Sequence, residues 1–73
     1  MITSGQCRAA RALLRWNQRE LAARANVGIT TVRTFETDVT APHRTTLNIL
    51  KETFEQAGIE FIYDNGIGVT LKA

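Results

Sequence analysis

The sequence predicts a mainly α-helical domain of four helices that ends in a short β-hairpin. Between residues 4 and 57, apolar side chains recur three and four positions apart, which is the spacing of one face of a helix. After Gly58 the pattern changes to two β-branched and aromatic runs, 59–63 and 67–71, separated by the hairpin signal Asp64-Asn65-Gly66. A chain of 73 residues that is 44% hydrophobic can form one small core.

The first helix is expected to begin after an N-cap at Thr3 or Ser4 and to run to about Arg15. Thr3 and Ser4 are both N-cap candidates, because their side-chain oxygens can accept a hydrogen bond from a free backbone N–H. Arg11 falls on or beside the apolar stripe, which is unusual for a charged residue. The stripe itself consists of Cys7, Ala10 and Leu14, with Leu13 beside them.

The second and third helices are expected to form a compact helix-turn-helix. Asn17 is a good N-cap for a helix over 18–25, and Glu20 follows at the capping-box position. Asn26-Val27-Gly28 ends this helix, and the third should span about 29–37. Its β-branched residues are poor helix formers, so tertiary packing must hold it helical. The expected inward residues are Leu21, Ala22 and Ala25 on the second helix and Val32 and Phe35 or Glu36 on the third.

A polar loop over 37–44, ended by Pro42, leads to a fourth helix over about 44–57. Its apolar stripe should face the core, and Gly58 is a natural residue to end it. An isolated hairpin is only marginally stable in water, so the C-terminal ribbon must pack on the helices or pair with a second chain. The stripe of the fourth helix is Leu47, Leu50, Phe54 and Ala57, with Ile49 adjacent.

Composition excludes several classes of protein. No apolar run approaches the length of a membrane span, and the N-terminal residues lack a secretory signal pattern, so we expect a cytoplasmic protein with no membrane partner. A single cysteine cannot form an internal disulfide, and Cys7 is expected to be a small core residue. No metal-ligand cluster or catalytic set is recognisable, so we expect no cofactor, no metal and no enzymatic activity.

The net charge of +2 is unevenly distributed. Residues 1–36 hold six arginines against two glutamates, a balance of +4, whereas residues 37–73 hold three cations against five acids, a balance of −2. Arginine offers a planar set of donors that suits phosphate and guanine. The alternative is a solvated basic surface, so this asymmetry favours nucleic acid only weakly.

Several residues of the first three quarters of the chain occur at a characteristic mutual spacing. They are Gln18, Leu21-Ala22, Val27, Thr31-Val32, Glu36, Pro42 and Thr46-Leu47. In this pattern, residues 2–57 resemble the phage-repressor (Cro/Xre-type) helix-turn-helix family. The resemblance implies a four-helix, repressor-like DNA-binding domain. The chain departs from the family at Asn26, commonly Gly, at Gly28, commonly Ser, and at Thr37-Asp38, commonly Asn-Gly.

The resemblance implies a role for particular side chains. The outward face of the third helix should contact base edges, through Ile29, Thr30, Arg33 and Thr34. Phosphate contacts are expected from Asn17 and Gln18, at the N-terminus of the second helix, and from Thr37 and Arg44, although Arg44 is equally well explained as a solvated charge. Arg11 and Glu36 both occupy inward positions, and the family pairs them. We therefore expect a structural salt bridge between them, because a buried charge requires a partner.

The expected function is sequence-specific binding of double-stranded DNA by a transcriptional regulator, a dimeric repressor that reads a palindromic operator through the major groove. Residues 1–58 would form the helix-turn-helix domain and residues 59–73 a hairpin extension. A homodimer would form through residues 59–72, by strand pairing or through the side chains of Ile59, Phe61, Tyr63 and Leu71. The alternative is an antitoxin-type interaction module that neutralises a partner toxin and regulates its own operon.

Overall fold

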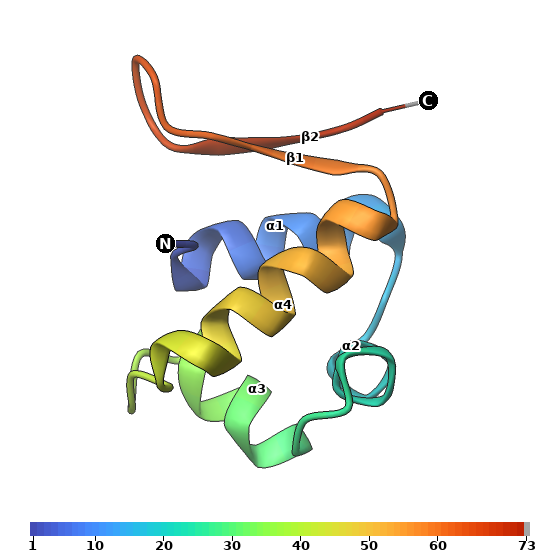
Figure 1. Cartoon of the computed structure of the whole chain (residues 1–73), viewed down its shortest axis with the longest axis vertical. Helices are drawn as coiled ribbons and strands as arrows, with labels where there is room; N and C mark the ends of the chain where they lie inside the picture. Colours follow the sequence, from blue (N-terminus) through green and yellow to red (C-terminus); the bar gives the residue numbers. More distant parts are fainter. Residues whose placement is uncertain (73) are drawn as a thin grey trace.

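The computed structural model describes residues 1–72 and consists of four helices followed by a two-stranded antiparallel hairpin, as the sequence predicts (Figure 1). The helices and strands begin and end within about a residue of the expected positions. They are α1 (Ser4–Leu14), α2 (Gln18–Ala25), α3 (Ile29–Glu36), α4 (Arg44–Gln56), β1 (Ile59–Ile62) and β2 (Gly68–Leu71).

Local sequence fixes the ends of α1 and α2. Thr3 caps α1 with a capping box, in which its hydroxyl accepts from the Gln6 N–H and the Gln6 side chain accepts from the Thr3 N–H. Asn17 caps α2 by accepting from the Glu20 N–H at 2.7 Å. Both helices end at a left-handed residue, Arg15 and Asn26 respectively. The Asn26 conformation turns the chain sharply between α2 and α3.

The core lies between the four helices and under the hairpin. Leu21, Val32, Leu50 and Phe54 are almost completely inaccessible to solvent and form its centre. The aromatic rings of Trp16, Phe54 and Phe61 continue it toward β1, with a stacked pair 5.8 Å apart and an edge-on pair 6.1 Å apart. The buried apolar residues are Ile2, Cys7, Ala10, Leu21, Ala22, Ala25, Val32, Phe35, Leu47, Leu50, Phe54 and Ile59.

Some expected core positions are less buried than the periodicity predicts. Leu13 and Ile49, which adjoin the stripes of α1 and α4, are exposed, and Leu14 is only half-buried. Leu13 and Ile49 lie at the edges of their apolar stripes, and Leu14 is the last residue of α1. In a domain of this size a helix has too few neighbours to cover a wide stripe completely.

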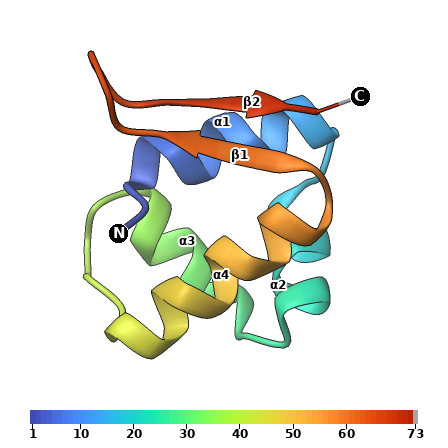
Figure 2. The same cartoon turned by 45° about the horizontal axis from the view of Figure 1, so that its top comes forward.

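The hairpin forms a layer across α1 and α4, with β2 above α1 and β1 above α4 (Figure 2). Its register pairs Glu60 with Thr70 and Phe61 with Val69. Ile59 is 3% exposed, while Phe61 and Val69 pack against the core. The expectation that Ile59 offers its side chain to a partner is therefore wrong, because packing under β1 turns it inward. The hairpin is part of the single core rather than an appendage.

A buried glutamine joins the hairpin to α1. Gln6 is 2% exposed, and its side-chain N–H groups donate to the carbonyls of Ile62 and Gly68, at 3.3 and 3.1 Å. These residues are the last hydrogen-bonded pair before the turn. One side chain thus both completes the α1 cap and fixes the hairpin above the helix, which the sequence alone did not suggest.

Candidate nucleic-acid interface

The outward face of α3 is at the opposite end of the molecule from the hairpin (Figure 1). Thr30, Arg33 and Thr37 are exposed and Thr34 is half-buried, and they follow the three- and four-residue spacing of one helix face. Arg33 makes no ion pair within residues 1–72, so its guanidinium is free to bind a ligand. The face therefore combines one unpaired cation with a row of small polar side chains.

Hydrogen bonds within the helix occupy the threonine hydroxyls. Thr34 donates to the Thr30 carbonyl at 2.9 Å, and Thr37 donates to the Arg33 carbonyl at the same distance. The Thr40 hydroxyl donates in turn to the Thr34 oxygen at 3.0 Å, which ties the following loop to α3. In this arrangement Thr34 and Thr37 offer methyl groups and oxygen lone pairs to a ligand rather than free donors.

Ile29 differs from the other three residues expected on the reading face. It is half-buried and packs against the core cluster, because the first turn of α3 lies close to α2. Part of its side chain is therefore committed to packing. The expected row of four outward residues is reduced to Thr30, Arg33 and Thr34, with Ile29 at its inner edge.

Glu36, at the last position of α3, is the centre of a buried polar network. It is 3% exposed, and the predicted salt bridge with Arg11 is present in bidentate form, at 2.6 Å from Nε and 2.7 Å from Nη2. Gln18 donates to the same carboxylate at 2.9 Å and the Cys7 thiol at 3.2 Å. Every side-chain oxygen of Glu36 is therefore satisfied, which is what a buried carboxylate requires.

The pKa values of this network follow from its geometry. Burial alone raises the pKa of Glu36, but the hydrogen bonds from Arg11, Gln18 and Cys7 outweigh burial and hold that pKa below its ordinary value. The hydrogen bond to Glu36 raises the pKa of Arg11. Burial, followed by the bond to the Glu36 carboxylate, raises the pKa of the Cys7 thiol well above its usual range. The network is therefore an ion pair with a neutral thiol beside it.

Two further contacts attach α1 to the helix-turn-helix. Arg11 also donates from Nη1 to the Trp16 carbonyl at 3.0 Å, and Arg8 donates to the backbone carbonyl of Glu36. The Arg8 contact satisfies one of the free carbonyls at the C-terminus of α3, where a positive charge is also favoured by the helix dipole. Two arginines of α1 thus hold α3 in position. The sequence indicated only Arg11, and no signal marked Arg8, Gln18 or Cys7 as members of this network.

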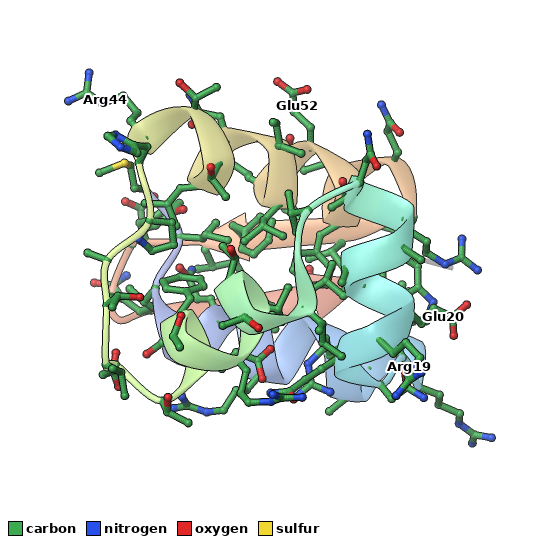
Figure 3. All side chains as sticks on the ribbon, turned by 90° about the horizontal axis from the view of Figure 1, so that it is seen from below. Arg19, Glu20, Arg44 and Glu52 are labelled. Atoms are coloured by element: carbon green, nitrogen blue, oxygen red, sulfur yellow. The ribbon has the colours of Figure 1, made fainter. Side chains whose placement is uncertain are left out.

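The residues expected to contact phosphate differ in how far their side chains are exposed and free to bind. Asn17 is exposed and uses only its oxygen for the cap, so its amide N–H groups are available. Gln18 is half-buried and directs its amide toward Glu36, which commits one donor of the side chain that was expected to point at phosphate. Arg44 is exposed at the start of α4 and extends away from the molecule, at the opposite corner of this face from Arg19 (Figure 3).

Asp38 introduces a negative charge at the edge of this face. It adopts a left-handed conformation, with φ at 60°, and directs its carboxylate toward the Ser4 hydroxyl at 2.7 Å. Asp tolerates this conformation better than most residues do, because its short side chain can hydrogen-bond locally. The backbone N–H groups that follow α3 fold back onto the carbonyls of Thr34 and Phe35 and so end the helix. The turn is formed without the glycine that is common at this position in the resembled family.

The surface therefore consists of a short exposed helix held at its C-terminal end by buried hydrogen bonds, with basic side chains at its borders. Within residues 1–72, none of the helices is long and apolar enough to cross a membrane. In comparisons with known proteins, no family model matches the chain, and no curated protein matches it.

Proposed function

We propose that this protein is a sequence-specific, double-stranded DNA-binding transcriptional regulator of the Cro/Xre repressor type, acting in the cytoplasm. The observation that carries the proposal is the exposed face of α3, on which Thr30 and Thr34 lie one helical turn apart beside Arg33, which forms no ion pair within residues 1–72. A helix of this length fits the major groove, and residues on one face of it can reach successive base edges. β-branched polar residues are poor choices for an exposed helix unless they bind something.

In this proposal Arg33 is the main specificity residue. Its guanidinium can donate two parallel hydrogen bonds to the O6 and N7 atoms of a guanine. Thr30 keeps a hydroxyl free of helix hydrogen bonds within residues 1–72, whereas Thr34 presents an oxygen already bonded twice. We therefore assign Thr34 to contact with a thymine methyl or a cytosine amino group, and Ile29 to a thymine methyl at the edge of the footprint.

The remaining surface supports the phosphate contacts. The first free N–H groups of α2, next to Asn17 and Gln18, form a site for one phosphate. Arg44, at the start of α4, would bind a phosphate on the other side of the groove, and Thr37, at the end of α3, would add a further contact. One such domain makes few phosphate contacts and binds weakly, so a homodimer through the hairpin would supply the second half-site.

Selection of bound duplexes from a random DNA pool tests this proposal. Wild-type protein should enrich one sequence motif, and Arg33→Ala should bind the enriched duplex about 5- to 150-fold more weakly, equivalent to the roughly 1–3 kcal/mol of one bidentate base contact. Arg33→Ala should also accept other bases at one position of the motif.

Arg24→Ala is the matched control, because it removes the same charge from a side chain that lies over the Trp16 ring, 4.4 Å from its centre, and pairs with Glu20. It should keep the preference of wild type. If Arg33→Ala instead weakened binding to every duplex equally, Arg33 would be a phosphate contact. Failure of wild type to enrich any motif would overturn the proposed function.

A further inference from the structure

The outer edge of β2 carries backbone groups with no hydrogen-bond partner within residues 1–72. Lys72 donates its N–H to the Gly58 carbonyl at 2.8 Å. Hydrogen-bonded and non-hydrogen-bonded pairs alternate along an antiparallel ladder, so the next hydrogen-bonded pairs toward the turn are Glu60–Thr70 and Ile62–Gly68. Val69 and Leu71 belong to the non-hydrogen-bonded pairs between these. The N–H and C=O groups of Val69 and Leu71 therefore point away from β1. Within residues 1–72 no other backbone or side-chain group bonds to them. Such an edge is a template for another strand.

β2 is short, at four residues, but it carries no proline, bulge or charged side chain. Protected edges usually carry proline, a bulge or an inward-pointing charge, whereas β2 reads Gly-Val-Thr-Leu with Lys72 after it. Figure 2 shows β2 as the strand farther from α4, in front of α1, and no further strand pairs with it within residues 1–72. The edge is therefore unprotected as well as unpaired.

Exposed apolar side chains border the same edge. Leu71 is 42% exposed and Ile67 62%, at the two ends of β2, and Leu13 is 43% exposed on α1. Gln6 contacts the start of β2, and Leu13 lies two helical turns beyond it on the same side of α1. Leu13 lies about 10 Å along α1 from Gln6, and Leu71 lies about 10 Å along β2 from Gly68. Because Gln6 contacts Gly68, Leu13 and Leu71 lie at similar distances from that contact.

We infer that this edge is the homodimer interface and that its occupant is the β2 strand of a second copy of the chain, paired antiparallel to form a four-stranded sheet. This inference rests on the proposed function, for which it supplies the second DNA-binding helix. Pairing centred on Val69 places Leu71 opposite Ile67 of the second copy, and does so twice by symmetry. It also places Lys72 opposite Gly66 of the second copy, two residues along the chain from Asp64 of that copy.

Symmetry favours this edge over the outer face of the hairpin. Two identical edges pair about a two-fold axis perpendicular to the sheet, so the helices of both copies remain on one side of it. The hairpin and α3 lie at opposite ends of the longest dimension, 29 Å (Figure 1). Edge pairing therefore directs both α3 helices toward one duplex, whereas stacking of the outer faces would direct them in opposite directions.

Sedimentation equilibrium of the full chain without DNA tests the interface. Wild type should be a dimer, and Leu71→Lys should raise its dissociation constant at least tenfold, because it places a charge against the apolar side chain of Ile67 of the second copy. Ile49→Lys is the matched control, because Ile49 is similarly exposed, at 38%, but lies on α4. A wild-type chain that remains monomeric at millimolar concentration would overturn the inference, as would equal effects of the two substitutions.

Amide hydrogen exchange measured by NMR provides a test that needs no variant. The N–H groups of Val69 and Leu71 should exchange more slowly as protein concentration rises, whereas that of Phe61, on the opposite edge of the hairpin, should not change. A dimer in which Val69 and Leu71 exchange independently of concentration would refute edge pairing. Because no DNA is present, these results are separate from those of the DNA selection, and either idea can fail alone.

Discussion

At the scale of single residues, Glu36 determines where α3 sits. Its carboxylate accepts from Arg11 and Gln18, and its backbone carbonyl accepts from Arg8, so it joins α1, α2 and α3 at one point. The charge of Arg11 on an apolar stripe was visible in the sequence, and the resemblance supplied its partner. The inward turn of Gln18 could not be predicted, because an exposed first residue of a helix and one aimed at a neighbouring helix have the same sequence signature.

Replacing Glu36 with alanine should lower the thermal midpoint by more than about 10 °C. The change leaves the Arg11 guanidinium, which is 19% exposed, without its partner, and breaking a buried pair costs about 3 kcal/mol or more. Glu20→Ala is the control, since its pair with Arg24 is exposed and should be worth only a few tenths of a kcal/mol. An unchanged midpoint in Glu36→Ala would contradict the structural role of the pair.

The same variant should show a distinctive dependence on pH. Because the folded-state pKa of Glu36 lies below its unfolded value of about 4.3, the stabilisation is fully present above that value and is lost as pH falls through the folded pKa. Urea unfolding from pH 7 toward pH 3 should therefore show the difference between wild type and Glu36→Ala becoming smaller in acid. A difference that stays constant over this range would mean that the charge of Glu36 does not stabilise the fold.

At the scale of elements, the ends of the helices were predictable because they depend on nearby residues. Thr3, Asn17 and Gly58 act within a few positions of themselves, and each ends or begins a helix where the sequence predicts. The exposure of Leu13 and Ile49 and the burial of Ile59 were not predictable in the same way. They depend on which elements pack above each side chain, and this is decided by contacts distant in sequence.

Two glycine substitutions should have opposite effects on stability. Gly28 is the N-cap of α3 and provides no side-chain hydrogen bond. Its φ of −69° suits any residue, and a Cβ added to it would lie in ordinary contact, 3.8 Å from Thr31 Oγ1. Gly28→Ser should therefore add a cap and stabilise by a few tenths of a kcal/mol, raising the midpoint by about 2 °C.

Gly58→Ser introduces the same side chain where φ is +103° and Leu71 and Lys72 atoms lie 3.4 Å from the added Cβ. It should destabilise by about 1 kcal/mol or more, since serine rarely adopts this backbone conformation. Calorimetry of both variants would check the pair. A destabilised Gly28→Ser would mean that the start of α3 cannot accommodate a capping side chain.

At the scale of the whole molecule, the hairpin and α3 lie at opposite ends of one core and would perform different tasks. The face of α3 would read DNA, while the free edge of β2 would join two chains. The sequence predicted both elements but not their relative position, because the loops between them allow many arrangements. Ile59, Phe61 and Val69 resolve this by packing on the helices, and Gln6 fixes the hairpin above α1.

The most direct test of DNA reading by α3 is an NMR titration of the isotope-labelled full chain with its selected duplex. We expect the largest amide shifts at Thr30, Arg33 and Thr34 and at the start of α2, with smaller shifts near Arg44. The amides of the hairpin, at the other end of the molecule, should change little once the protein is dimeric. Shifts concentrated on the hairpin or on the outer side of α4, with α3 unaffected, would contradict the assignment of α3 as the helix that reads DNA.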